Sequence, residues 1–289
     1  MNLRGRKIFR YFFLCLFITI FTITSSFAGL KGVGTENRDW VTGPEVPNVS
    51  LPIYDIIEEN NLMVPMRDGV KLQVNIYRPV LPEGAGPPPG ILCTTGYGVD
   101  FYTFYFVPSL IDLAKRGYVV VYASLRGSGL SEGVNNLYNQ YGNDGYDLVE
   151  WMASQPWCDG NVGMVGSSLL GISQWLAAKE NPPHLKAINP HIACGDCYDI
   201  LWYPGGMLPG PGRVARGAPE YPSAMEHRNF DEWWRERVSI EEDHKKIASN
   251  GIAVLMSGGW NDYISPGNIR AFEEFIGPRK MLIVGPWAH

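Results

Sequence analysis

The fold is decided by one stretch of sequence, Val162-Gly-Met-Val-Gly-Ser-Ser-Leu-Leu-Gly-Ile-Ser-Gln-Trp-Leu-Ala-Ala-Lys-Glu180. Residues 162–166 are typical of a strand buried on both faces, and residues 169–180 of a helix that ends before a pair of prolines. Ser168 therefore lies on a tight strand-to-helix turn, with its hydroxyl at the edge of the sheet. The N–H of Leu169, at the helix start, has no intrahelical partner and is a candidate donor to an oxyanion. The pattern predicts a nucleophilic serine, with a purely structural turn as the alternative.

The turn departs from the common nucleophile pattern Gly-x-Ser-x-Gly, because Leu170 stands at the second glycine and Gly171 comes one residue later. A serine hydroxyl also needs a base to take its proton, and the base needs a carboxylate to hold its tautomer. In α/β-hydrolases these groups follow in the order Ser, acid, His, each just after a strand. The predicted triad is Ser168 with Asp262, after the apolar run 252–257, and His289, after the run 281–284. The other histidines are expected to be structural.

Short apolar runs alternate with helical stretches along the rest of the chain. The runs cover residues 90–95, 117–123, 162–166, 185–189, 252–257 and 281–284, and the helical stretches 107–116, 143–153, 169–180 and 269–275. Two earlier runs, 60–66 and 71–77, meet at Arg67-Asp68-Gly69 and predict a hairpin. Asp144 and Asp147 suit the N-terminus of the helix at 143–153. The alternation predicts an α/β-hydrolase fold, with a mostly parallel sheet and helices on both faces.

The chain divides into five predicted segments: a signal peptide at 1–28, an N-terminal arm at 29–57, the first part of the core at 58–197, a helical cap insertion at 198–250, and the second part of the core at 251–289. The insertion is rich in aromatic residues and is expected to cap the carboxyl edge of the sheet, where such folds bind ligands. Trp202, Trp233 and Trp234 are candidate substrate-binding residues. The alternative is that these rings fill a small core of the insertion itself.

The first 28 residues have the composition of an export signal. Four basic residues precede an apolar stretch at 11–24, and Ser26-Phe27-Ala28 provides small residues for cleavage. The apolar stretch is shorter than the roughly 20 residues that span a bilayer. We therefore expect an exported protein, periplasmic or secreted, with no stable membrane span after cleavage. An uncleaved anchor is the alternative.

Charge and cysteine content limit the other possibilities. The formal net charge of −5 gives no reason to expect nucleic acid as a partner. Outside the signal segment there are four cysteines, Cys93, Cys158, Cys194 and Cys197. An even number in an exported chain permits disulfides. For Cys194 and Cys197 a local disulfide and two free thiols both remain open, with a redox or metal role as a remote third.

Several motifs, in the same order, resemble those of the CocE/NonD hydrolases, a group similar to the Xaa-Pro dipeptidyl-peptidases. They are Ser124-Leu-Arg-Gly-Ser-Gly-Leu-Ser-Glu-Gly133, Asp144-Gly-Tyr-Asp147, Gln155-Pro-Trp-Cys158, Gly166-Ser-Ser-Leu-Leu-Gly171, Gly259-Trp-Asn-Asp262 and Gly285-Pro-Trp-Ala-His289. The resemblance implies the same triad. In cocaine-esterase-like members, a tyrosine hydroxyl after the first core strand joins the oxyanion hole, and Tyr97 stands at the matching place. Its alternative is a packing role.

The sequence departs from that group in two ways. Ser124 stands where an aspartate is usual, which is expected to alter loop hydrogen bonding more than catalysis. Relatives also continue into a C-terminal β-sandwich, whereas this sequence stops at His289, so we expect either a fragment or a histidine at a free chain end.

The predicted reaction is the hydrolysis of ester or amide bonds through an acyl-enzyme, without a metal or organic cofactor. The expected partners are small-molecule esters, amides or short peptides. The choice between a broad esterase and a dipeptidyl-peptidase stays open, with the esterase slightly favoured. The alternative from another class is a non-catalytic or inactive truncated binding protein on a hydrolase fold.

Overall fold

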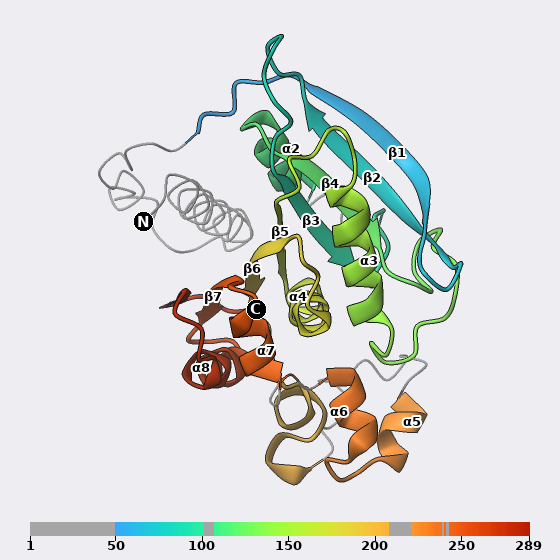
Figure 1. Ribbon diagram of the computed structural model, residues 1–289. Coiled ribbons are helices and arrows are strands. Elements are labelled where there is room, and N and C mark those ends of the chain that lie inside the picture. The colour runs from blue at the N-terminus through green and yellow to red at the C-terminus, as the bar shows by residue number, and fades with distance from the viewer. Residues whose placement is uncertain (1–49, 101–106, 208–220, 239, 241–242) are drawn as a thin grey trace, which may run out of the picture.

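The computed structural model describes residues 50–100, 107–207, 221–238, 240 and 243–289 (Figure 1). Eight strands form one sheet in the order β1-β2-β4-β3-β5-β6-β7-β8. The strands are β1 Ile56–Pro65, β2 Lys71–Pro79, β3 Gly90–Thr95, β4 Val119–Ser124, β5 Val162–Ser167, β6 Leu185–His191, β7 Ala253–Gly259 and β8 Lys280–Gly285. Pairs β1/β2 and β2/β4 are antiparallel and all others are parallel. The predicted α/β-hydrolase fold with a mostly parallel sheet is confirmed.

Helices occupy most of the connections between the parallel strands. They are α2 Val107–Lys115, α3 Tyr141–Ala153, α4 Leu169–Glu180, α5 Tyr221–Glu226, α6 Glu232–Val238, α7 His244–Ser249 and α8 Ser265–Glu274, with a short π-helix η1 at Tyr198–Trp202 and a 3-10 turn η2 at Pro204–Gly206. Because parallel strands need such crossovers, the carboxyl ends of β3, β5, β6, β7 and β8 all meet at one edge of the sheet.

The period of two along the central strands separates two apolar cores, one on each face of the sheet. Ile91 and Cys93 of β3 belong to one core with residues of α2, and Leu92 belongs to the other with residues of α3. In β4, Tyr122 and Val121 divide in the same way. Every residue of both strands is buried, which explains their nearly continuous apolar sequences.

Helix α4 contributes residues to both cores and is buried on nearly all sides. Leu170 and Ile172 pack into one core, while Trp175 and Ala177 pack into the other. A helix that is apolar all round must be buried. This burial fixes the helix whose first turn follows Ser168.

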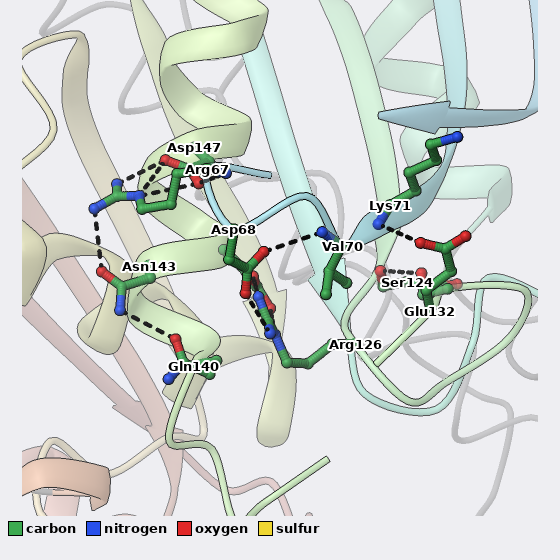
Figure 2. A network of polar contacts seen from close by, with 12 residues as sticks. Arg67, Asp68, Val70, Lys71, Ser124, Arg126, Glu132, Gln140, Asn143 and Asp147 are labelled. Atoms are coloured by element: carbon green, nitrogen blue, oxygen red, sulfur yellow. Dashed lines mark hydrogen bonds and ion pairs between the residues drawn. The ribbon is translucent and has the colours of Figure 1, made fainter. Parts of the chain in front are cut away.

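The predicted hairpin is confirmed, and ion pairs tie its turn to α3 (Figure 2). Arg67 and Asp68 lie in the turn, where Arg67 pairs with Asp147 at 2.6 Å and Asp68 with Arg126 at 2.9 Å. Arg126 also reaches Asp144 at 2.5 Å. The predicted helix is confirmed, but the prediction that Asp144 is its N-cap is wrong. Helix α3 begins at Tyr141 after the N-cap Gln140, Asp144 lies in its first turn, and both aspartates bind arginines far away in sequence.

The segment between β6 and β7 carries η1, η2 and three short helices. Figure 1 shows α5 and α6 next to each other beyond one end of the sheet. The predicted boundaries of the cap and of the other segments stay predictions. The predicted signal peptide and most of the predicted arm lie outside the described residues. Within the described part of the chain, no helix is long and apolar enough to cross a membrane.

Candidate active site

Ser168 lies between the end of β5 and the first residue of α4, as the sequence predicts. Its backbone has φ 58° and ψ −125°, a region that residues other than glycine seldom adopt. Three backbone hydrogen bonds hold it there. The N–H of Ser168 donates to the carbonyl of His191 at 2.9 Å, and its own carbonyl accepts from Gly171 and Ile172. The turn therefore presents the serine side chain at the carboxyl edge of the sheet.

Two glycines allow this turn to close. A Cβ on Gly166, whose φ is 146°, would lie 2.6 Å from Cβ of Leu170. A Cβ on Gly171 would lie 2.5 Å from Cβ of Ala193, in the segment after β6. The shifted second glycine of the motif thus serves the contact between α4 and the neighbouring segment, while Leu170 fills the space beside Gly166.

Asp262 lies in the loop between β7 and α8, with a completely buried side chain. Its Oδ1 accepts the N–H of Ile264 at 2.9 Å, and its own N–H donates to the carbonyl of Gly259 at 3.0 Å. The carboxylate is therefore fixed before it meets a base. Burial of an acidic group requires such partners.

His289 connects the acid to the serine. Its Nδ1 lies 3.0 Å from Oδ2 of Asp262, and its Nε2 lies 3.0 Å from Oγ of Ser168. The imidazole is 37% exposed and stacks on the ring of Tyr263, with centroids 5.2 Å apart. The structure thus brings the three predicted triad residues together with hydrogen-bonding geometry on both imidazole nitrogens.

Backbone bonds tie the segment before His289 to the loop of the acid. The N–H of Trp260 donates to the carbonyl of Gly285 at 2.8 Å, and that of Asn261 to the carbonyl of Trp287 at 3.0 Å. The histidine is therefore held by its own loop as well as by its side-chain partners.

Tyr97 follows β3, the direct neighbour of the strand that ends at Ser167. Its ring is 43% exposed and its N–H donates to Oγ1 of Thr95. A Cβ on the preceding Gly96 would lie 2.8 Å from the side chain of Leu169, so this loop contacts the first residue of α4. The two predicted oxyanion donors therefore come from adjacent segments at the same edge of the sheet.

Ser124, the last residue of β4, joins two loops at this edge. Its Oγ accepts the N–H of Val99 at 2.9 Å and donates to Oε1 of Gln73 at 3.1 Å. The same amide oxygen accepts the N–H of Leu130. The hydroxyl thus supports the loop that carries Tyr97.

His191, one of the histidines expected to be structural, is a neighbour of the proposed triad. It ends β6, lies almost completely buried, and its Nδ1 is 2.7 Å from Oγ of Ser257. Burial lowers its pKa to about 4, partly opposed by the charge of Asp262 and assisted by that of His289. The ring is therefore neutral at pH 7, and its carbonyl is the acceptor for the N–H of Ser168. The position of His191 at the end of β6, the strand beside β5, is the sequence feature that could have indicated its closeness to Ser168.

Asn268, in α8, was not predicted either. Its side chain is completely buried; Nδ2 donates to the carbonyl of Ser257 at 2.8 Å and Oδ1 accepts the N–H of Ala193 at 3.2 Å. It thereby joins the ends of β6 and β7. Strand β6 ends at His191, whose carbonyl holds the N–H of Ser168, and β7 leads to Asp262.

The aromatic residues predicted to bind substrate mostly pack against each other. Trp234 is completely buried and its Nε1 donates to the carbonyl of His227. Trp202, 3% exposed, contacts the ring of Trp234, and Trp233 stacks on His227. Packing, the alternative interpretation, is what these contacts show. Substrate contact by Trp202 and Trp233 stays a prediction.

A sheet of this topology, with a serine turn at its carboxyl edge, defines the α/β-hydrolase class. Residues 68–216 and 210–289 match the family model described as X-Pro dipeptidyl-peptidase (S15 family). The chain belongs to this family, which places it among the hydrolases.

Individual relatives agree with the family. The cocaine esterase of Rhodococcus sp. (strain MB1 Bresler) is 30% identical over 286 residues, which cover 80% of this chain and 48% of the relative. A crystal structure of a CocE/NonD family hydrolase from Staphylococcus aureus has a TM-score of 0.68 at 28% identity, and covers 81% of this chain and 46% of that one. The resemblance to CocE/NonD hydrolases is confirmed.

An α-amino-acid ester hydrolase, at 20% identity with a TM-score of 0.61, covers 89% of this chain and 52% of its own, and shares the fold. The chain spans about half the length of the curated relatives it matches.

Proposed function

We propose that this protein is a serine hydrolase that cleaves carboxylic esters by acyl transfer to water, with Ser168, Asp262 and His289 as its catalytic triad. One observation carries the proposal. The imidazole of His289 has one nitrogen 3.0 Å from the serine hydroxyl and the other 3.0 Å from a buried carboxylate. A general base must be within about 2.6–3.2 Å of the proton that it takes.

In the first half of the reaction, Nε2 of His289 accepts the proton of the Ser168 hydroxyl while Oγ attacks the ester carbonyl. Asp262 accepts a hydrogen bond from Nδ1–H, which keeps the basic lone pair on Nε2 and stabilises the imidazolium that forms. The protonated imidazole then gives its proton to the leaving alcohol. Water, deprotonated by the same nitrogen, attacks the acyl-enzyme. The acid is released, and the imidazolium returns its proton to Oγ of Ser168.

The negative charge on the carbonyl oxygen needs donors that are already in place. The N–H of Leu169, at the first residue of α4, has no intrahelical acceptor. The Tyr97 hydroxyl is the second proposed donor, because its loop contacts Leu169. Both donors are proposed because they come from neighbouring segments at the edge of the sheet that carries Ser168.

An ester is favoured over an X-Pro peptide by the state of the carboxylates that could bind an α-amino group. A dipeptidyl-peptidase must bind a free α-amino group, usually through carboxylates that face the pocket, and the sequence offers Asp196, Asp199, Glu220 and Glu226 for that role without a dedicated cluster. Asp196 accepts the N–H of Tyr198, and Asp199 pairs with Arg270. Asp199 is thus paired with a cation through one of its oxygens, and Asp196 is bonded to its own loop, which makes both less available to an ammonium group. The proposed substrate is therefore a small neutral ester.

A fluorophosphonate probe tests the nucleophile. We expect it to label the full chain at Ser168, and the Ser168→Ala variant to lose the label. Ser167→Ala, one residue earlier at the end of β5, is the matched control and should keep it. Labelling that survives in Ser168→Ala would contradict the assignment.

Paired substrates test the bond that is cleaved. We expect hydrolysis of p-nitrophenyl acetate or butyrate, abolished in Ser168→Ala, and a much lower kcat/KM for an Ala-Pro p-nitroanilide. A higher kcat/KM for the anilide would replace the esterase with a dipeptidyl-peptidase while leaving the triad intact. Labelling without turnover of either substrate would favour an inactive hydrolase-fold protein.

We also propose that the protein is exported. The support is the basic and apolar pattern of residues 1–28. N-terminal sequencing of the protein from the periplasm or medium should begin at Gly29. Recovery of the uncleaved chain in the membrane fraction would indicate an anchor instead.

A further inference from the structure

Cys194 and Cys197 face one another in the segment between β6 and η1. Both side chains are completely buried, and their Sγ atoms are 2.8 Å apart. The four cysteines in the described part of the chain carry free thiols in the structure. Non-bonded heavy atoms settle at about 3.5–4.0 Å, and a thiol is only a weak hydrogen-bond donor. The two sulfur atoms are therefore held closer than two separate thiols would settle.

We propose that Cys194 and Cys197 form an intrachain disulfide in the mature protein. The bond restrains, or braces, the segment that contacts both α4, the helix after Ser168, and α8, the helix after Asp262. The proposal concerns a modification site and does not depend on the hydrolase activity.

The surroundings do not fit a thiol that exchanges disulfides catalytically. Such a thiol needs a low pKa, at a helix N-terminus or beside a cation. Although Cys197 stands at the start of the short π-helix η1, burial raises its pKa well above its ordinary value, and its hydrogen bond to Cys194 and the charges of Asp196 and Asp199 act in the same direction. A bond formed here is buried and remote from thiolates, as in structural disulfides.

The bond forms by thiol–disulfide exchange before burial is complete. The oxidant is a protein or low-molecular-weight disulfide, which accepts two electrons. Each cysteine loses its proton, the sulfur–sulfur bond between Cys194 and Cys197 forms, and the bond of the oxidant breaks to give two thiols. The compartment proposed above supplies such oxidants.

The braced segment lies against both catalytic helices. Ala193 contacts Gly171 of α4, where an added Cβ would lie 2.5 Å from Cβ of Ala193, and Cys194 contacts Gly267 of α8 in the same way at 2.6 Å. The carbonyl of Cys197 accepts the N–H groups of Leu201 and Trp202, which begins η1. A short covalent loop at this point therefore restrains the spacing of α4, α8 and η1.

The remaining two described cysteines are internal controls. Cys93 lies in one core and Cys158 in the other, on opposite faces of the sheet. Burial raises the pKa of both, to about 12 for Cys93. Both are buried as well, but neither has a sulfur partner at bonding range among the described residues, so oxidation should distinguish the two sets.

Differential alkylation tests the proposal directly. The full chain, made in an oxidising compartment, is denatured with excess N-ethylmaleimide, then reduced, treated with iodoacetamide and mapped by mass spectrometry. We expect N-ethylmaleimide on Cys93 and Cys158, and iodoacetamide on Cys194 and Cys197 only. N-ethylmaleimide on all four, or a bond that includes Cys93 or Cys158, would overturn the proposal.

Thermal unfolding provides a second, independent readout. Each protein is unfolded and refolded with or without dithiothreitol. Reductant should lower the Tm of the wild type and of Cys158→Ala, and should leave the Cys194→Ala/Cys197→Ala variant unchanged. An equal effect of reductant on all three would refute the brace. If the double variant does not fold, the alkylation pattern of the wild type still decides.

Discussion

The neutral state of His191 predicts that the protein loses stability as the pH falls below about 6.5. Its pKa is lowered from 6.5 to about 4, mainly by burial. Between these values the unfolded chain binds a proton at this residue and the folded chain does not, so stability falls with pH in this window. The difference of about 2.5 units corresponds to about 3 kcal/mol, fully present above pH 6.5 and lost by about pH 4.

Urea denaturation at pH 7.5, 6.5, 5.5 and 4.5 measures this dependence for the wild type and for His191→Asn. Asparagine places a polar atom near the position of Nδ1 and so preserves the contact with Ser257. The variant is expected to be less stable at pH 7.5, because a smaller side chain leaves a cavity. Between pH 6.5 and 4.5 its free energy of unfolding should nevertheless fall less steeply than that of the wild type. The two slopes should differ by up to about 1.4 kcal/mol per pH unit.

Other histidines define the control. His244 is also buried, which lowers its pKa, so part of the wild-type slope remains in His191→Asn. His184 is 47% exposed, and its ring pairs with Glu150 at the surface. The free energy of unfolding of His184→Gln should therefore depend on pH as that of the wild type does, and should differ from that of His191→Asn in the same way. Parallel pH profiles for the wild type and His191→Asn would refute the reasoning, since they would show that His191 takes up its proton equally in both states.

Three further predictions concern the site itself. Tyr97→Phe should lower kcat by about 10²–10³, the usual loss for one oxyanion donor, with KM little changed; a kcat within threefold of wild type would assign the oxyanion hole to backbone alone. Tyr263→Leu should lower kcat about threefold to tenfold, because the aromatic contact with His289 is lost, whereas Tyr263→Phe should retain it; equal losses in both would exclude the stack. Gly171→Ala should lower the free energy of unfolding in urea by about 1–3 kcal/mol, and Ala193→Gly should restore part of that loss by removing the opposing methyl; strictly additive costs would contradict the contact.

The strands were predictable from sequence because each central strand is buried on both faces. Residues 90–95 are apolar or small throughout, and all six are buried in β3. The start of α3 was not predictable in the same way. Asp144 suits a helix cap by local pattern, but its partner Arg126 is 18 residues away, and a long-range ion pair leaves no periodic signal.

The three residues proposed as the triad could be selected by their order along the chain, because the carboxyl ends of parallel strands meet at one edge. Their neighbours could not. His191 and Tyr263 reach the site through β6 and through the loop after β7, and nothing in their local sequence distinguishes them from packing residues. Aromatic composition likewise could not separate a pocket from a small core. Trp234, predicted to bind substrate, is completely buried.

The backbone at Ser168 explains why the serine turn was nevertheless recognisable. Its φ of 58° costs a residue other than glycine about 1–3 kcal/mol. Glycine would remove the strain, but the proposed chemistry needs a hydroxyl at that position. The cost must therefore be offset by neighbours: the carbonyl of His191 fixes the N–H, and Gly166 and Gly171 let adjacent segments approach. Because the strained position is a serine and not a glycine, the turn needs small residues around it, and these are visible in the sequence as Gly166 and Gly171.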